Sequence, residues 1–100
     1  MRRAIMMLIP AAMFLAIGST HVAAQSTFEV NVDRPGLDYR NFDLARSRPR
    51  LCQEECLDDR RCRAWTFVRP GFQGPEPRCW LKYDVPASTP SECCVSGVAR

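Results

Sequence analysis

Six cysteines are the residues of this 100-residue chain best suited to chemistry. They are Cys52, Cys56, Cys62, Cys79, Cys93 and Cys94. Thiols in this number can form disulfides, bind zinc or exchange disulfides with a partner. Zinc sites usually space their ligands as C-x2–4-C pairs, and the long gap between Cys62 and Cys79 does not fit that pattern. We therefore expect disulfides, with no metal and no other cofactor.

Residues 1–24 have the features of a secretory signal peptide: a basic pair at the start, an apolar run, and small residues before a cleavage site. The apolar run is interrupted by Pro10 and is short for a membrane span of about 20 residues. We expect cleavage after Ala24 and a single domain at residues 25–100. That domain would be periplasmic or secreted, without stable insertion in a membrane.

The only histidine, His21, lies inside the expected signal peptide. The remaining chain has no Ser-His or Cys-His pair for nucleophilic catalysis, so we expect no enzyme. The formal charge of +3 includes Arg2 and Arg3, and removing these two leaves +1. A charge this small does not favour nucleic acid as a partner. We expect a monomer.

The sequence around the first four cysteines predicts a helix beside a β-hairpin. Cys52 and Cys56 are four residues apart, so they lie on one face of a short helix. Such a helix is unstable alone in water and needs covalent anchoring to the hairpin. The predicted elements are strands at 28–33, 61–68, 78–82 and 93–98, a helix at 51–59 and an irregular segment at 37–44.

Three motifs, taken together, resemble the PAN/apple domain, and the bacterial secreted type in particular. They are the C-x3-C pattern of residues 52–56, the CRAWTF run of 62–67 and the CWLK run of 79–82. The resemblance implies a small disulfide-rich α+β domain with a curved antiparallel sheet packed on one short helix. It also implies a role in binding a protein or a carbohydrate.

The resemblance further implies the disulfides Cys52–Cys79 and Cys56–Cys62. Cys93 and Cys94 are then left over as an adjacent pair. They can bond to each other, one can displace a core partner, or they can be free or bridge to another chain. The sequence leaves these three possibilities open.

A candidate binding surface follows from strand alternation. If Cys62 and Cys79 point toward the helix, their neighbours on the two strands point away from it, and a long Pro- and Gly-rich loop at 69–77 joins them. The candidate residues are Arg63, Trp65, Phe67, Phe72, Arg78, Trp80 and Lys82. The alternative is that the large aromatic residues belong to the core, since a small domain rarely leaves several of them exposed.

We therefore expect an exported, non-enzymatic module that binds a protein or a carbohydrate. Two other functions remain open: a secreted inhibitor or toxin-like effector, and a thiol redox sensor that uses Cys93 and Cys94.

Overall fold

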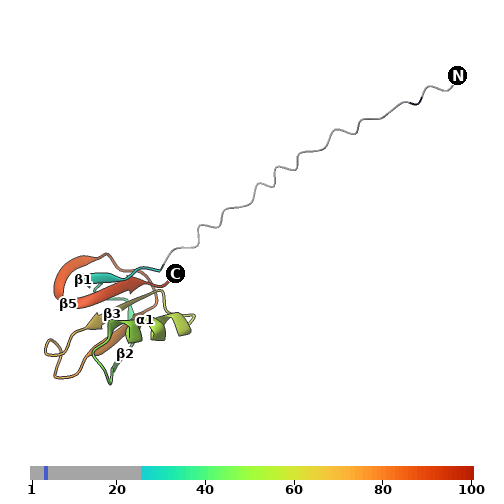
Figure 1. Cartoon of the computed structure of the whole chain (residues 1–100). Coiled ribbons are helices and arrows are strands. Elements are labelled where there is room, and N and C mark those ends of the chain that lie inside the picture. Colours follow the sequence, from blue (N-terminus) through green and yellow to red (C-terminus); the bar gives the residue numbers. More distant parts are fainter. Residues whose placement is uncertain (1–3, 5–25) are drawn as a thin grey trace.

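The described residues fold into a curved five-stranded sheet with one short helix packed on one face (Figure 1). The structure is a computed structural model that describes Ala4 and residues 26–100, so the expected signal peptide otherwise lies outside the described residues. The strand order is β1-β5-β3-β4-β2, and all neighbouring strands are antiparallel. The elements are β1 (Glu29–Asp33), β2 (Asp38–Asp43), α1 (Pro49–Asp58), β3 (Ala64–Val68), β4 (Arg78–Lys82) and β5 (Thr89–Val98).

Helix α1 is anchored to the sheet by two disulfides. It begins at Pro49, whose fixed φ and missing N–H suit the first turn of a helix. Cys52 is bonded to Cys79 in β4, and Cys56 is bonded to Cys62 just before β3. This is the pairing that the resemblance implies, and all four cysteines are fully buried. Among the described residues, no helix has the length and apolar character needed to cross a membrane.

The hydrophobic core lies between α1 and the sheet. Trp65 and Phe67 of β3 are opposite Leu81 and Cys79 of β4, and directly opposite residues of an antiparallel pair share a face. All four side chains are at most 1% exposed. Because Cys79 is bonded to α1, this shared face is the one toward the helix.

The alternation counted from Cys62 was therefore wrong for Trp65 and Phe67, which it placed on the face away from the helix. Strand β3 begins only at Ala64, and Arg63 lies in a bend. The bend shifts the two-residue period by one position, which moves every following side chain to the other face. The alternative that these aromatic residues belong to the core describes both of them.

Strands β1 and β2 are consecutive in the chain yet form opposite edges of the sheet. Residues 34–37, which we call the 34–37 link, are all that joins them. Five Cα steps span at most about 18 Å, whereas four strand spacings come to about 19 Å. The link must therefore cross a curled sheet by a short path. Lys82 Nζ donates to Gly36 O at 3.0 Å, which places the link over β4 on the face away from α1, the far face.

Candidate functional site

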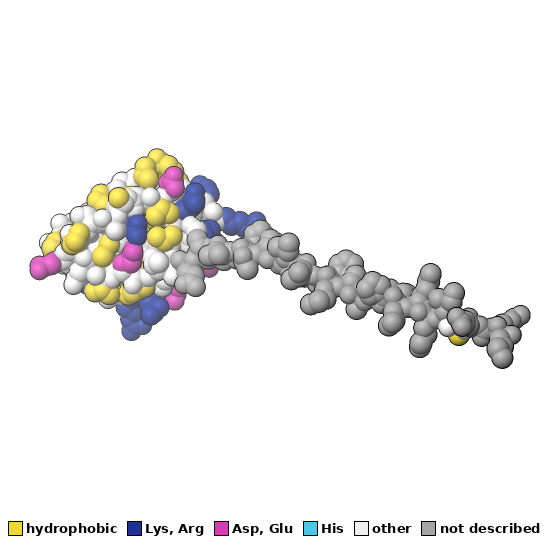
Figure 2. Space-filling view, turned by 90° about the horizontal axis from the view of Figure 1, so that it is seen from above, with side chains coloured by type: hydrophobic (Ala, Val, Ile, Leu, Met, Phe, Trp, Pro, Cys, Tyr) yellow, Lys and Arg dark blue, Asp and Glu magenta, His cyan; other side chains and the backbone are white. Residues whose placement is uncertain are grey.

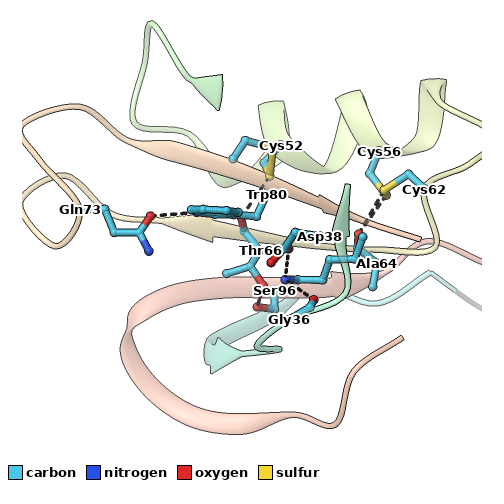
Figure 3. A network of polar contacts seen from close by, with 12 residues as sticks. Gly36, Asp38, Cys52, Cys56, Cys62, Ala64, Thr66, Gln73, Trp80 and Ser96 are labelled. Carbon is cyan, nitrogen blue, oxygen red and sulfur yellow. Dashed lines mark hydrogen bonds and ion pairs between the residues drawn. A yellow bond between two sulfur atoms is a disulfide. The ribbon is translucent and has the colours of Figure 1, made fainter. Parts of the chain in front are cut away.

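A hollow of about 180 Å³ lies on the far face between the sheet and the 34–37 link, and we call it the far-face hollow. Figure 3 shows side chains that point into this side of the sheet, with α1 and its cysteines on the other side. The hollow is lined by Asp33, Pro35, Gly36 and Asp38, by Thr66, Val68, Trp80 and Lys82 of the sheet, and by Gln73 of the β3–β4 loop.

A buried lysine lies in the wall of the hollow. The side chain of Lys82 is 2% exposed, and its Nζ is 2.5 Å from Asp38 Oδ1 and 3.0 Å from Gly36 O. A buried charge needs such partners, because its desolvation is costly otherwise. An ammonium group has three N–H donors, and two are used here. The third can donate to an acceptor in the hollow.

Two buried hydroxyl groups lie on the same face of β3 and β5. Thr66 and Ser96 are opposite residues of these strands, and their oxygens are 2.8 Å apart. Both residues are at most 2% exposed. Each hydroxyl can donate once and accept twice, so the pair keeps hydrogen-bonding capacity beyond its mutual bond. Thr66 can direct that capacity into the hollow that it lines.

Trp80 forms the aromatic wall of the hollow. Its ring is half-buried, and its indole N–H donates to Gln73 Oε1 at 2.8 Å (Figure 3). The guanidinium carbon of Arg78 lies 5.8 Å from the ring centroid. Arg78 is itself held by Asp43 at 2.7 Å. The ring is thus fixed at its polar edge and remains partly open to solvent.

The seven residues that the sequence marked for binding do not form one surface. Trp65 and Phe67 lie in the core. Arg63 precedes β3 and pairs with Asp84 at 3.5 Å, and Phe72 is 58% exposed in the β3–β4 loop. The remaining three come from β4, and the structure brings them to the far face. On the side of the molecule seen in Figure 2, exposed hydrophobic side chains are interspersed with polar and charged ones.

Sequence reasoning missed most of the hollow. Asp33 and Asp38 enter it because the 34–37 link crosses the far face, and nothing in their own sequence neighbourhood indicates that path. Thr66 could have been found by counting the alternation of β3 from Ala64, and the Pro35-Gly36 turn was the signal for a sharp change of direction between β1 and β2.

A second polar cluster lies outside the hollow and joins β2 to the end of α1. The Tyr39 hydroxyl donates to Asp59 Oδ2 at 2.7 Å, and Arg61 donates to the same carboxylate. The hydrogen bond from Tyr39, together with those from Arg61, lowers the pKa of Asp59 to about 2. Burial and the bond to Asp59 raise the pKa of Tyr39 to about 12. These groups stabilise the fold and leave no carboxylate oxygen of Asp59 unpaired.

A small disulfide-linked α+β scaffold with a partly polar hollow on its sheet belongs to the class of binding modules. A family model described as the PAN domain matches residues 32–82, and the chain belongs to this family. Searches among curated proteins and solved structures found no match. PAN domains in general mediate protein or carbohydrate interactions and are typically non-enzymatic. The disulfides and the family fit an extracellular or secreted location.

Proposed function

We propose that this chain is an exported, non-enzymatic recognition module that binds a carbohydrate ligand in the far-face hollow. The observation that carries the proposal is the half-buried ring of Trp80, fixed by its hydrogen bond to Gln73, at the edge of a hollow with polar walls.

The walls of the hollow match the chemistry of a sugar ring. A sugar offers one apolar face, which an aromatic side chain can cover, and several hydroxyl groups that both donate and accept. Trp80 supplies the aromatic surface. Lys82 supplies a spare N–H, while the hydroxyl of Thr66 supplies a donor and an acceptor. A few convergent polar groups on an otherwise formed pocket are the usual means of orienting a small ligand.

Charge and size narrow the ligand further. The charges of Lys82 and Asp38 are already paired, so the hollow offers no unpaired cation to attract an acidic ligand. Sites for drug-sized ligands occupy about 300–1,000 Å³, and the far-face hollow is smaller. The proposal is therefore one neutral sugar unit, within a glycan whose remaining units extend into solvent.

Export rests on two features. Residues 1–24 have the composition of a signal peptide, and the six cysteines form three disulfides, which persist in oxidising compartments. The proposed location is the periplasm or the outside of the cell.

A glycan array followed by NMR titration tests the proposal. We expect selective binding of a neutral glycan that the free monosaccharide competes away. Added sugar should shift the indole N–H signal of Trp80 and the side-chain amide of Gln73. Binding of a protein instead, with shifts in the β3–β4 loop around Phe72 and none at Trp80, would contradict the carbohydrate site.

A further inference from the structure

A disulfide between adjacent residues, Cys93 and Cys94, lies where β5 bends. Strand β1 pairs with β5 at Val30↔Val95 and again at Val32↔Pro90. Residues 91–94 of β5 therefore lie opposite residue 31 alone. An insertion of this kind bends a strand and increases its twist. The curve of β5 over the sheet is visible in Figure 1.

Hydrogen bonds fix both sides of this bend. The N–H of Arg69 donates to Cys93 O at 2.8 Å, and the Arg69 guanidinium bonds to Glu92 O and to Cys94 O. Ser91 Oγ lies 3.1 Å from Cys93 Sγ. The position of the β5 bend therefore depends on the backbone at the disulfide.

The bend is next to a wall of the far-face hollow. A carboxylate oxygen of Asp33 and the two sulfur atoms of Cys93 and Cys94 all lie within 4.8 Å of one another. Asp33 pairs with Thr89 at the beginning of β5, and it lines the hollow. A change of backbone at the disulfide therefore reaches the hollow through a single residue.

We propose that the Cys93–Cys94 disulfide is a reversible redox site that controls the shape of the far-face hollow. With the disulfide formed, the two adjacent residues are held in one ring and the bend of β5 is restricted. Reduction frees the peptide between them, so that β5 can straighten and Asp33 can leave the wall. Ligand binding is then weaker in the reduced protein. The effect on binding rests on the function proposed above, whereas the effect on Asp33 does not.

The reaction needs a dithiol reductant. A thiolate of the dithiol attacks Cys93 Sγ, the Sγ–Sγ bond breaks, and Cys94 leaves as a thiolate and takes up a proton. The second thiol of the reductant then attacks the mixed disulfide and releases Cys93 as a thiol. Two electrons and two protons pass to the protein, and the dithiol becomes its own disulfide.

Exposure makes this disulfide the one open to attack. Cys93 is half-buried, whereas the four cysteines of the other two disulfides are fully buried. Thiol–disulfide exchange requires access to a sulfur atom. A mild dithiol is therefore expected to reduce Cys93–Cys94 while the links between α1 and the sheet stay intact.

The test compares the oxidised protein, the protein under a mild dithiol and the double variant Cys93→Ser/Cys94→Ser. After reduction we expect two reactive thiols per chain, both mapped to this pair. In amide NMR spectra, the signals of Asp33, Thr89 and the Trp80 indole should shift. The double variant should resemble the reduced protein and should not change when the dithiol is added, which controls for effects of the reductant elsewhere.

Binding of the glycan found on the array is measured on the same three samples. Affinity should fall roughly tenfold on reduction, a usual size for coupling between two sites, and should recover on reoxidation. Shifts confined to residues 91–95 would overturn the redox control, as would equal affinity of oxidised and reduced protein. If no form binds a glycan, the proposed function fails, and the NMR signals of Asp33 and Trp80 still decide the redox inference.

Discussion

Trp65 and Trp80 lie on neighbouring antiparallel strands but point to opposite faces of the sheet. Trp65 is opposite Leu81, whereas Trp80 is opposite Thr66. The first ring is fully buried against α1, and the second is half-buried beside the far-face hollow. The two tryptophans therefore have separable roles, since one belongs to the core and the other to the candidate site.

Replacing Trp65 tests its place in the core. Its indole nitrogen is buried and has no hydrogen-bond partner. Trp65→Ala should cost about 3–5 kcal/mol of unfolding free energy. Trp65→Phe should cost clearly less, because it keeps an aromatic ring and removes a buried unpaired donor. Urea unfolding measures both variants, and equal costs would show that the indole nitrogen finds a partner in solution.

Gly97 should not tolerate a side chain. A Cβ at this position would lie 2.3 Å from Thr27 O and 2.7 Å from the ring of Trp65. Overpacking of this kind costs about 1–3 kcal/mol, so Gly97→Ala should lower Tm by several times about 4–8 °C at most. Gly74→Ala is the control, because its Cβ would meet nothing within 4 Å. It reports only the strain of a positive φ, and a larger loss there than at Gly97 would contradict the packing account.

The pair formed by Lys82 and Asp38 should respond asymmetrically to mutation. The Lys82 side chain is 2% exposed and that of Asp38 is 26% exposed. Asp38→Asn leaves a buried ammonium uncompensated, which costs about 3 kcal/mol. Lys82→Met leaves a carboxylate that water can reach, so its cost should be smaller. The double variant should recover part of the loss. Denaturant unfolding of the three proteins measures this, and a greater cost for Lys82→Met would contradict it.

The Tyr39–Asp59 hydrogen bond should make stability depend on pH at both extremes. The pKa of Asp59 falls from 3.8 to about 2 on folding, so its contribution is present above pH 3.8 and is lost as pH falls through 2. The pKa of Tyr39 rises from 10.0 to about 12, so its contribution is present below pH 10 and is lost as pH rises toward 12.

Tyr39→Phe is the matched variant for this pair, because it keeps the ring and removes the hydroxyl. The loss of stability above pH 10 that comes from this residue should disappear, and the pKa of Asp59 should rise toward 3.8. Carboxyl NMR titration and unfolding across the pH range measure both effects. An unchanged Asp59 pKa in the variant would show that Arg61 alone lowers it.

The cysteine spacing carried most of the fold prediction. Cys52 and Cys56, one turn apart, predicted a helix anchored to a hairpin, and the strand expected at 78–82 is β4 as observed. Strand β5 begins earlier than the predicted strand at 93–98, because residues 89–90 pair with β1 despite Pro90. Proline is tolerated there because this part of β5 pairs only with β1 and one side of its backbone needs no partner. The PAN family assignment is confirmed.

The site was less predictable because it depends on contacts between distant segments. One bend at Arg63 reversed the face of Trp65 and Phe67, and local propensity does not reveal such a bend. The hollow needs Asp38 and Lys82, which are far apart in the chain and meet only because the 34–37 link crosses the sheet. Trp80 was placed correctly on the far face because Cys79, its neighbour, is bonded to α1.

The most direct test of the central claim is the Kd of the array-selected glycan for Trp80→Ala, measured together with Tm. The variant should bind at least about 30-fold more weakly, which corresponds to the roughly 2 kcal/mol of a binding hot spot. Its Tm should fall by no more than about 8 °C, the size of a 1 kcal/mol loss in a domain of this length. Phe72→Ala, exposed in the same loop region, is the control and should bind normally. An unchanged Kd for Trp80→Ala, or loss of binding in Phe72→Ala instead, would contradict the far-face hollow as the binding site.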